Sequence, residues 1–282
     1  MLMANGTIRP KARVGGHIAL ALLLLMACAS AKAQKEKACL ISVGHVDILD
    51  TYLSQEKATG LELRYNKERL NRKLVACGDT ASTRLRKWST FVSQEALVAK
   101  AGTRGNSNSF LGAMYNLRLG WHYNVDRSRL NVRFGLLGDF TLGGIYNTRN
   151  SNNPAQLKLA LSVAPSVMAI WRFCVKGKPL ALRYEASAPV AGLAFSPNYG
   201  QSYYEIFTRG NYDHNVVPTT VGCAPSLRQL LALDITLGRT ALRLGYMGDV
   251  RQAEVNNLKQ HTYNHMFVLG MVRRFTICRM QP

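Results

Sequence analysis

The sequence has no long hydrophobic run after its first 33 residues. A run of about 18 apolar residues is the least that suggests a transmembrane helix. No segment after residue 33 reaches that length. Transmembrane helices are therefore excluded for residues 34–282.

Cysteines, acidic residues and catalytic motifs are scarce as well. The six cysteines form no CxxC pair and no zinc-binding pattern, and no GxSxG motif marks a serine nucleophile. The 16 Asp and Glu residues face 36 Lys and Arg residues. A basic excess of this size suits an anionic partner, either nucleic acid or the phosphate-rich face of an outer membrane.

The N-terminus predicts export. Basic residues precede the apolar run Ile18–Ala27, which is too short to span a bilayer and is followed by a small-residue cleavage pattern at residues 31–33. Residues 1–33 are therefore predicted to be a signal peptide. The mature chain, residues 34–282, keeps 32 Lys and Arg against 16 Asp and Glu, and export favours the outer membrane as its anionic partner.

A lipoprotein signal is the alternative interpretation of the same segment. In that interpretation Cys28, which follows Leu25-Met26-Ala27, would be acylated. Met26 fits the lipoprotein pattern poorly, so ordinary cleavage after Ala33 is favoured.

Apolar and polar residues alternate repeatedly through the mature chain. From Leu130 to Leu142 nearly every second residue is apolar, while Asn131, Arg133 and Asp139 lie between them, as in a strand with one polar side. The same pattern, in places weaker, marks residues 39–49, 60–70, 84–98, 113–123, 157–173, 180–185, 227–237, 242–249 and 265–275. The sequence therefore predicts about 10 antiparallel strands, with 12 as the alternative.

The lengths of the predicted connections follow strand parity. One set is short or compact and comprises residues 75–83, 124–128, 176–179 and 238–239. The other set is mostly longer and comprises residues 50–59, 100–109, 143–154, 195–224 and 251–260. Such segregation is typical of an outer-membrane barrel, whose strands need about 9–11 residues to cross. We predict a closed antiparallel transmembrane β-barrel, all-β, with short periplasmic turns, longer outer loops and both termini in the periplasm.

A secreted β-sandwich would also show alternating strands. However, a sandwich gives no reason for loop length to follow strand parity, or for Arg and Asp to lie repeatedly opposite leucines. Aromatic residues near strand ends, such as Tyr123 and Trp171, also suit the girdles at membrane interfaces. The pattern therefore favours the barrel.

The polar side of each strand would line the lumen of this barrel. Charged residues and one histidine occupy that side: Glu62, Arg64, Arg118, His122, Arg133, Asp139, Lys158, Arg172, Arg183, Glu185, Arg228, Asp234, Arg243 and Asp249. Side chains fill the lumen of small barrels, and confined charges are generally paired. We predict a lumen crossed by ion pairs, without a wide aqueous pore, in which His122 is structural.

Closure of the sheet makes the first and last strands neighbours. Cys39 and Cys278 lie at the periplasmic ends of these two strands, and a disulfide needs its two residues to lie close together. We hypothesise that they form a disulfide across this seam.

Several segments spread over the mature chain carry a family resemblance. They are LDTYLS (49–54), GWHYN (120–124), YNTRNSNNPAQ (146–156), FSPNYGQSYYEIFTRGNYDHN (195–215), SLRQ (226–229) and LRLGYMGDVRQ (242–252). In these segments the chain resembles an uncharacterised domain-of-unknown-function family of exported outer-membrane barrel proteins from anaerobic Gram-negative bacteria. The family has no established activity, so the resemblance implies location and architecture but no chemistry.

The stretch Pro197–Asn215 is the longest polar, aromatic-rich interruption of the alternation, and a loop of this length is usually functional or disordered. Asp213 and His214 could act in a hydrolase at the rim of the barrel, with Tyr204, Asp249 or Ser226 completing the site. The favoured interpretation is a folded loop packed by its own Tyr rings. Neither a nucleophile motif nor a metal-ligand spacing accompanies the pair, and we predict no cofactor and no metal.

The sequence thus predicts a protein of the outer membrane of a Gram-negative bacterium, with a structural or interaction role at the cell surface. A rim hydrolase acting on lipid or peptide and a narrow solute channel are the alternatives. Outer-membrane lipid and lipopolysaccharide are the predicted partners, and nothing indicates nucleic acid. The basic residues expected to contact lipopolysaccharide phosphates are Lys100, Arg104, Arg149, Arg209 and Arg251.

Overall fold

The structure, a computed structural model, describes residues 33–76, 83–105, 107–150, 153–238 and 240–277. Strands and one short helix make up most of these residues. In this part of the chain no helix is long and apolar enough to cross a membrane. The predicted signal peptide lies outside the described residues except for Ala33.

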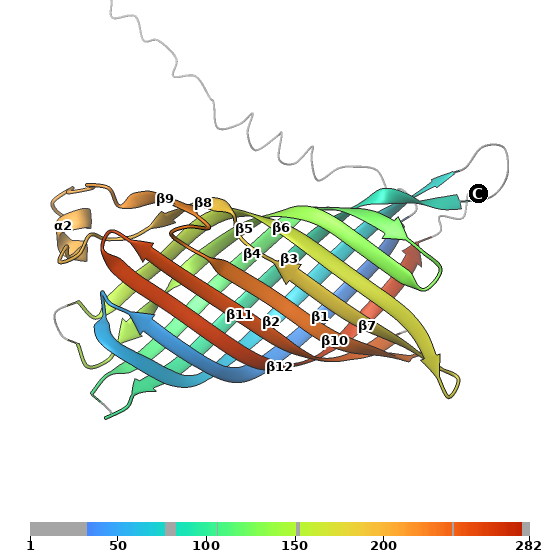
Figure 1. Cartoon of the computed structure of the whole chain (residues 1–282), viewed down its shortest axis with the longest axis horizontal. Helices are drawn as coiled ribbons and strands as arrows, with labels where there is room; N and C mark the ends of the chain where they lie inside the picture. The colour runs from blue at the N-terminus through green and yellow to red at the C-terminus, as the bar shows by residue number, and fades with distance from the viewer. Residues whose placement is uncertain (1–32, 77–82, 106, 151–152, 239, 278–282) are drawn as a thin grey trace, which may run out of the picture.

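Ten strands form a closed antiparallel barrel (Figure 1). They are β1 (Ala33–Asp50), β2 (Ser54–Ala76), β3 (Thr83–Thr103), β4 (Ser109–Asp126), β5 (Leu130–Asn147), β6 (Ala155–Val175), β7 (Lys178–Ser187), β10 (Ser226–Leu237), β11 (Thr240–Val255) and β12 (Leu258–Ile277). The first and last strands, β1 and β12, pair along their lengths and so complete the ring. The predicted fold class and the predicted adjacency of the terminal strands are confirmed.

Two further strands, β8 (Ala191–Phe195) and β9 (Val216–Thr220), extend the wall at one end. β8 pairs with residues 160–163 of β6, next to the stretch of β6 that pairs with β7, and β9 pairs with β8. The prediction of one loop over residues 195–224 is wrong here, because this stretch contains β9 and the helix α2 (Tyr203–Phe207). Strands of five residues are too short to establish an alternation.

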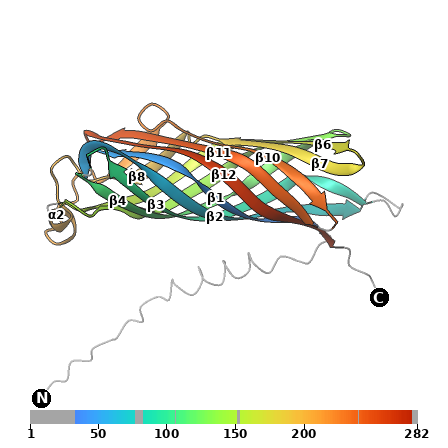
Figure 2. The ribbon, with the colours of Figure 1, turned by 90° about the horizontal axis from the view of Figure 1, so that it is seen from below.

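Two outer connections are much tighter than predicted. The predicted loop at residues 50–59 is a turn of residues 51–53, and the loop at 251–260 is a turn at Asn256 and Asn257. Both Asn residues have positive φ, 52° and 59°, which Asn tolerates better than most residues. The surrounding polar residues belong to the ends of strands. The long connection, residues 196–215, lies at the end of the barrel opposite the end of β12 (Figures 1 and 2).

The barrel is apolar outside and polar inside. Leu61, Trp121 and Phe267 are 67%, 65% and 56% exposed, whereas Arg64, Glu95 and Arg243 are buried. A soluble sandwich would show the opposite arrangement. The predicted assignment of the two sides of the strands is therefore confirmed, although Arg172 is exposed near the end of β6, where the interior side meets solvent.

Apolar layers also fill part of the interior, which the sequence did not predict. At the end that carries α2, Ile48, Tyr52 and Phe110 belong to a buried cluster, and Tyr203 of α2 packs against it. Two more buried apolar clusters lie within the barrel. Buried ion pairs and apolar clusters therefore share the interior of the barrel.

Candidate functional site

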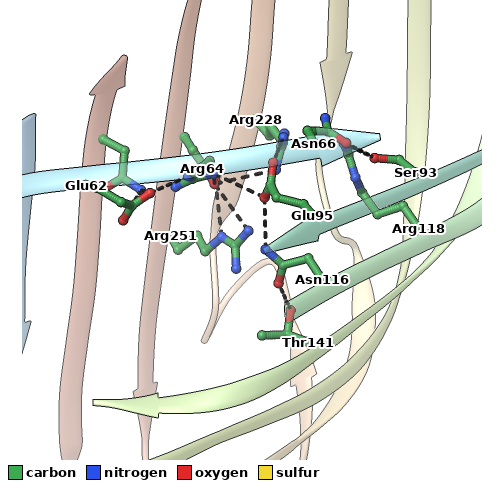
Figure 3. Close-up of polar contacts among 12 residues, drawn as sticks. Glu62, Arg64, Asn66, Ser93, Glu95, Asn116, Arg118, Thr141, Arg228 and Arg251 are labelled. Atoms are coloured by element: carbon green, nitrogen blue, oxygen red, sulfur yellow. Dashed lines mark hydrogen bonds and ion pairs between the residues drawn. The ribbon is translucent and has the colours of Figure 1, made fainter. Parts of the chain in front are cut away.

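A network of ion pairs crosses the middle of the lumen (Figure 3). Arg64 on β2 donates from Nη1 to Asp249 Oδ2 on β11 at 2.6 Å and to Glu95 Oε1 on β3 at 3.4 Å. Its Nε donates to the neighbouring Glu62. All four side chains are buried, and charges in such a site need partners to offset the loss of water. The network joins strands that lie far apart along the chain.

Glu95 is the centre of this network. Arg228 on β10 donates through both terminal nitrogens to the two carboxylate oxygens, with Nη1 2.7 Å from Oε1. Asn116 Nδ2 on β4 also donates to Oε1, at 3.0 Å, and the Asn116 amide oxygen accepts from Thr141 at 2.9 Å. Paired bonds from a guanidinium to a carboxylate are among the strongest in proteins. One carboxylate thus connects four strands.

A second ionic layer lies nearer the chain termini. Arg243 on β11 donates from Nε and Nη2 to the two oxygens of Asp234, at 2.7 and 3.0 Å. Arg274 on β12 donates to Asp234 at 3.0 Å, and Arg183 on β7 donates to Glu36 on β1 at 2.8 Å. The predicted lumen of ion pairs is present in both layers.

Between the layers, the polar side chains are less completely satisfied. Arg118 donates from Nη2 to Ser93 Oγ at 3.0 Å, and His122 Nε2 lies 2.7 Å from Ser166 Oγ. Arg118 Nε and His122 Nδ1 have no hydrogen-bond partner among the described residues. A cavity of about 30 Å³ beside them has room for a water molecule.

A larger cavity of about 220 Å³ lies between the central network and the wall at β8 and β9. Val190 and Phe195 contribute apolar lining, and the charged lining consists of Glu62, Arg64, Asp139, Lys158, Arg228, Asp249 and Arg251. Several of these charges are paired, among them Arg251, whose Nη2 lies 3.2 Å from Asp249 Oδ2. Asp139 Oδ1, in contrast, has no hydrogen-bond partner among the described residues.

The long connection, residues 196–215, packs on one end of the barrel, and we call it the cap. The ring of Tyr203 packs edge-on against Tyr52, at 5.8 Å between centroids, and its hydroxyl accepts from the backbone N–H of Leu157 at 2.7 Å. The Tyr52 hydroxyl donates to the Gln201 carbonyl at 3.0 Å. Burial and the nearby Asp50 and Glu205 carboxylates raise the pKa of Tyr52 to about 12. The predicted packing by the loop's own Tyr rings is seen for Tyr203, whose partner Tyr52 lies in another connection, whereas Tyr199, Tyr204 and Tyr212 are exposed.

The helix α2 begins with a capping box. Ser202 Oγ accepts from the Glu205 N–H at 3.3 Å, and the Glu205 carboxylate accepts from the Ser202 N–H at 2.8 Å. These hydrogen bonds hold the pKa of Glu205 below its ordinary value. A depressed carboxyl pKa contributes stability above the ordinary Glu pKa that is lost as pH falls through the folded value, so acid should loosen the cap.

Replacing Ser202 with alanine should destabilise α2 by about 1 kcal/mol, because the helix loses its N-cap acceptor. Hydrogen exchange should then quicken at the amides of residues 203–208 and stay unchanged in the barrel strands. Ser226→Ala is the matched control, since Ser226 Oγ only donates to the Ala224 carbonyl, at 3.4 Å. Unchanged exchange in α2 would contradict a capping role for Ser202.

Of the residues predicted for a hydrolase, the structure brings together Asp213 and His214. His214 Nδ1 hydrogen-bonds Asp213 on an exposed segment. Tyr204 lies under the Arg209 guanidinium, 5.5 Å from it, on the exposed side of α2, and Asp249 is buried in the central network. Neither contacts the pair, so the hydrolase hypothesis stays a prediction that rests on Asp213 and His214.

The basic residues predicted at the outer surface divide into two groups. Lys100, Arg104, Arg149 and Arg209 are exposed. Arg251 lines the cavity and pairs with Asp249 inside the barrel, so its prediction as an outer-loop residue is wrong. Its side chain points inward because it alternates in phase with Asp249.

The predicted disulfide is only half described. Cys39 is exposed on β1 and lies opposite Met271 of β12 in the register. Cys278 lies outside the described residues. The disulfide between Cys39 and Cys278 stays a prediction.

Comparison with known proteins identifies a family without a known activity. The sequence model of the family described as "Protein of unknown function (DUF3316)" matches residues 18–282. No curated protein matches the chain.

Solved structures with similar folds are bacterial barrels. The β domain of the Bordetella autotransporter BrkA is 12% identical, with 86% of this chain and 100% of that chain covered and a TM-score of 0.43. The outer membrane protease OmpT from Escherichia coli is 7% identical, with 87% and 98% covered and a TM-score of 0.42. Neisserial surface protein A is 10% identical, with 85% and 97% covered and a TM-score of 0.34. These values say nothing about the activity of this chain.

Proposed function

The chain belongs to the DUF3316 family of proteins of unknown function, and from this premise we propose that it is a non-conducting outer-membrane barrel that presents an ordered cap at the cell surface. The observation that carries the proposal is the network of paired side chains across the middle of the lumen. Two ionic layers and three apolar clusters occupy the interior, and α2 packs on the end of the barrel. Such a barrel is suited to anchoring the cap at the membrane surface.

The outer side of the wall supports a membrane location. Large apolar side chains are exposed on the strands, among them Ile41, Leu61, Leu63, Leu136 and Leu269. Every strand of the ring has at least the length of about 9–11 residues that crossing requires. The start of β1 and the end of β12 lie at one end of the barrel, and the long connection of residues 196–215 lies at the other, although tight turns occur at both ends. Outer-membrane barrels place their termini in the periplasm and their longer loops outside, which supports an outward-facing cap.

The cap and its neighbouring turns give this protein its interaction surface. Exposed Lys100, Arg104, Arg149 and Arg209 would contact lipopolysaccharide phosphates, since Arg recognises phosphate through paired hydrogen bonds. Exposed tyrosines, among them Tyr199, Tyr204 and Tyr212, add aromatic contact area of the kind that interfaces favour. The role proposed is therefore structural or adhesive, without turnover of a substrate.

The purified full-length protein in a planar bilayer should show no stable conductance steps, because paired side chains cross the middle of its lumen. Heat-modifiable migration on a gel would establish beforehand that the barrel is folded. Regular conductance steps from folded protein would contradict the proposal and favour the narrow solute channel instead.

A further inference from the structure

Unpaired basic residues gather at the end of the barrel that carries the chain termini. We call this set the basic collar; its exposed members are Lys37, Lys67, Arg69, Lys73, Arg86, Lys87, Arg127, Arg129, Arg172, Lys176, Lys178 and Arg273. In the described part of the chain no acid forms an ion pair with any of them. The exposed acid described at this end, Asp126, pairs with Arg72.

The opposite end of the barrel has a different balance of charge. There Lys57 pairs with Asp47, and Lys259 pairs with Glu254. The exposed residues at that end include acids as well as bases, among them Glu56 and Asp213. The basic excess of the sequence is therefore concentrated at the end with the termini.

One row of the collar brings three cations side by side. Lys37 on β1 lies opposite Arg69 on β2 and opposite Arg273 on β12 in the register, and all three are exposed on the outer side of the wall. Directly opposite residues have Cβ atoms about 4.5–5.5 Å apart, and like charges at that separation destabilise a sheet. An anion bound between them would remove this repulsion.

The row lies where the apolar part of the wall ends. Two residues further along β1 from Lys37, Cys39 lies between Met271 and Lys67. Four residues along, the exposed Ile41 lies between Leu269 and Tyr65, so the wall has become apolar and aromatic there. Aromatic rings lie at the level of the collar. The Lys37 ammonium lies 5.9 Å from the ring centroid of Phe275. The Lys87 ammonium lies 5.8 Å from the ring centroid of Tyr123. Aromatic rings and basic residues together are typical of a membrane interface.

We propose that Lys37, Arg69 and Arg273 bind the phosphate of an anionic phospholipid headgroup in the leaflet on the side of the chain termini. Arg69 and Arg273 supply guanidinium donors from both sides, and Lys37 supplies a point charge between them. The collar extends over strands β1, β2, β3, β6, β7 and β12 and over the turn between β4 and β5. Such a ring fits a lipid surface that surrounds the barrel better than a protein partner seated on one side.

This inference rests on the proposed membrane barrel, and its test separates the two. The full-length protein is reconstituted into nanodiscs that contain phosphatidylethanolamine, phosphatidylglycerol and lipid A, and the lipids retained after gentle release are counted by native mass spectrometry. Wild type should retain phosphatidylglycerol in preference to phosphatidylethanolamine. The variant Lys37→Gln, Arg69→Gln, Arg273→Gln should retain at least about tenfold less phosphatidylglycerol, and about 0.5 M salt should weaken retention by wild type.

The variant Lys100→Gln, Arg104→Gln, Arg209→Gln removes the same charge at the other end and should leave phosphatidylglycerol retention unchanged. Equal phosphatidylglycerol retention by wild type and by the Lys37, Arg69, Arg273 variant (the collar variant) would overturn the inference. An equal loss of phosphatidylglycerol from both triple variants would overturn it as well. Loss of lipid A instead of phosphatidylglycerol from the collar variant would overturn the assignment to a phospholipid. Failure of folded wild type to enter the nanodisc at all would overturn the proposed membrane barrel itself.

Discussion

Replacing Glu95 with glutamine should lower the free energy of unfolding of this barrel by about 3–5 kcal/mol, the range for removing one partner of a buried ion pair. The carboxylate accepts from Arg228 through both oxygens and from Arg64 and Asn116 through Oε1. Glutamine preserves the volume but removes the negative charge, so two buried guanidinium groups would lose a counter-charge. Asp249 would still pair with both guanidinium groups, which limits the loss of stability.

The measurement is equilibrium unfolding in guanidinium chloride from phospholipid vesicles, followed by tryptophan fluorescence. Glu254→Gln is the matched control, because its ion pair with Lys259 has both side chains 65% exposed and should contribute about 0–1 kcal/mol. A Glu95→Gln variant as stable as the Glu254→Gln variant would show that the central network does not hold the strands together.

Replacing Leu63 with arginine should cost about 2–4 kcal/mol, the range for a basic residue on the lipid side of a barrel near the bilayer midplane. Leu63 is 49% exposed on β2 and lies opposite Val43 and Val98, which are also exposed. On a water-facing surface the same change would be nearly neutral. The size of the effect therefore reports directly on whether this side of the wall faces lipid.

A depth control strengthens the test of the lipid-facing side. Thr90 on β3 is exposed on the outer side and lies opposite Asn71 and Trp121, nearer the level of the basic collar. Thr90→Arg should lower the free energy of unfolding by only about 0–1 kcal/mol, the range for a basic residue near the bilayer interface. If Leu63→Arg and Thr90→Arg both had equally small effects on unfolding from vesicles, lipid would not contact the outer side of the wall at Leu63.

The alternation of residue types was sufficient to predict which side of each strand faces inward. Leu61 and Leu63 point outward and Glu62 and Arg64 inward, because a period of two fixes side-chain direction once a strand exists. The count of about 10 strands follows from the same pattern. Alternation does not fix register between strands, so the sequence alone could not pair Arg64 with Asp249 or Arg228 with Glu95.

The residues that the sequence missed lie where the pattern is weak. Glu95 falls in a strand whose inward positions mix Ser93, Leu97 and Ala99, and its charge did not stand out among them. Glu36 lies beside the predicted cleavage point, before the first predicted strand. The helix α2 spans five residues, which is too short to be stable without the contacts that hold it on the barrel. Only the tertiary structure supplies those contacts.

The pairing of the first strand with the last has a consequence for how the barrel assembles. Until β12 pairs with β1 and β11, each of these two strands presents a free edge, with 18 pairing positions on β1 and 16 on β11. Free strand edges are templates for pairing with other chains and hence for aggregation. A barrel that has not yet paired its last strand is therefore expected to associate with its own copies, and pairing of β12 removes both edges.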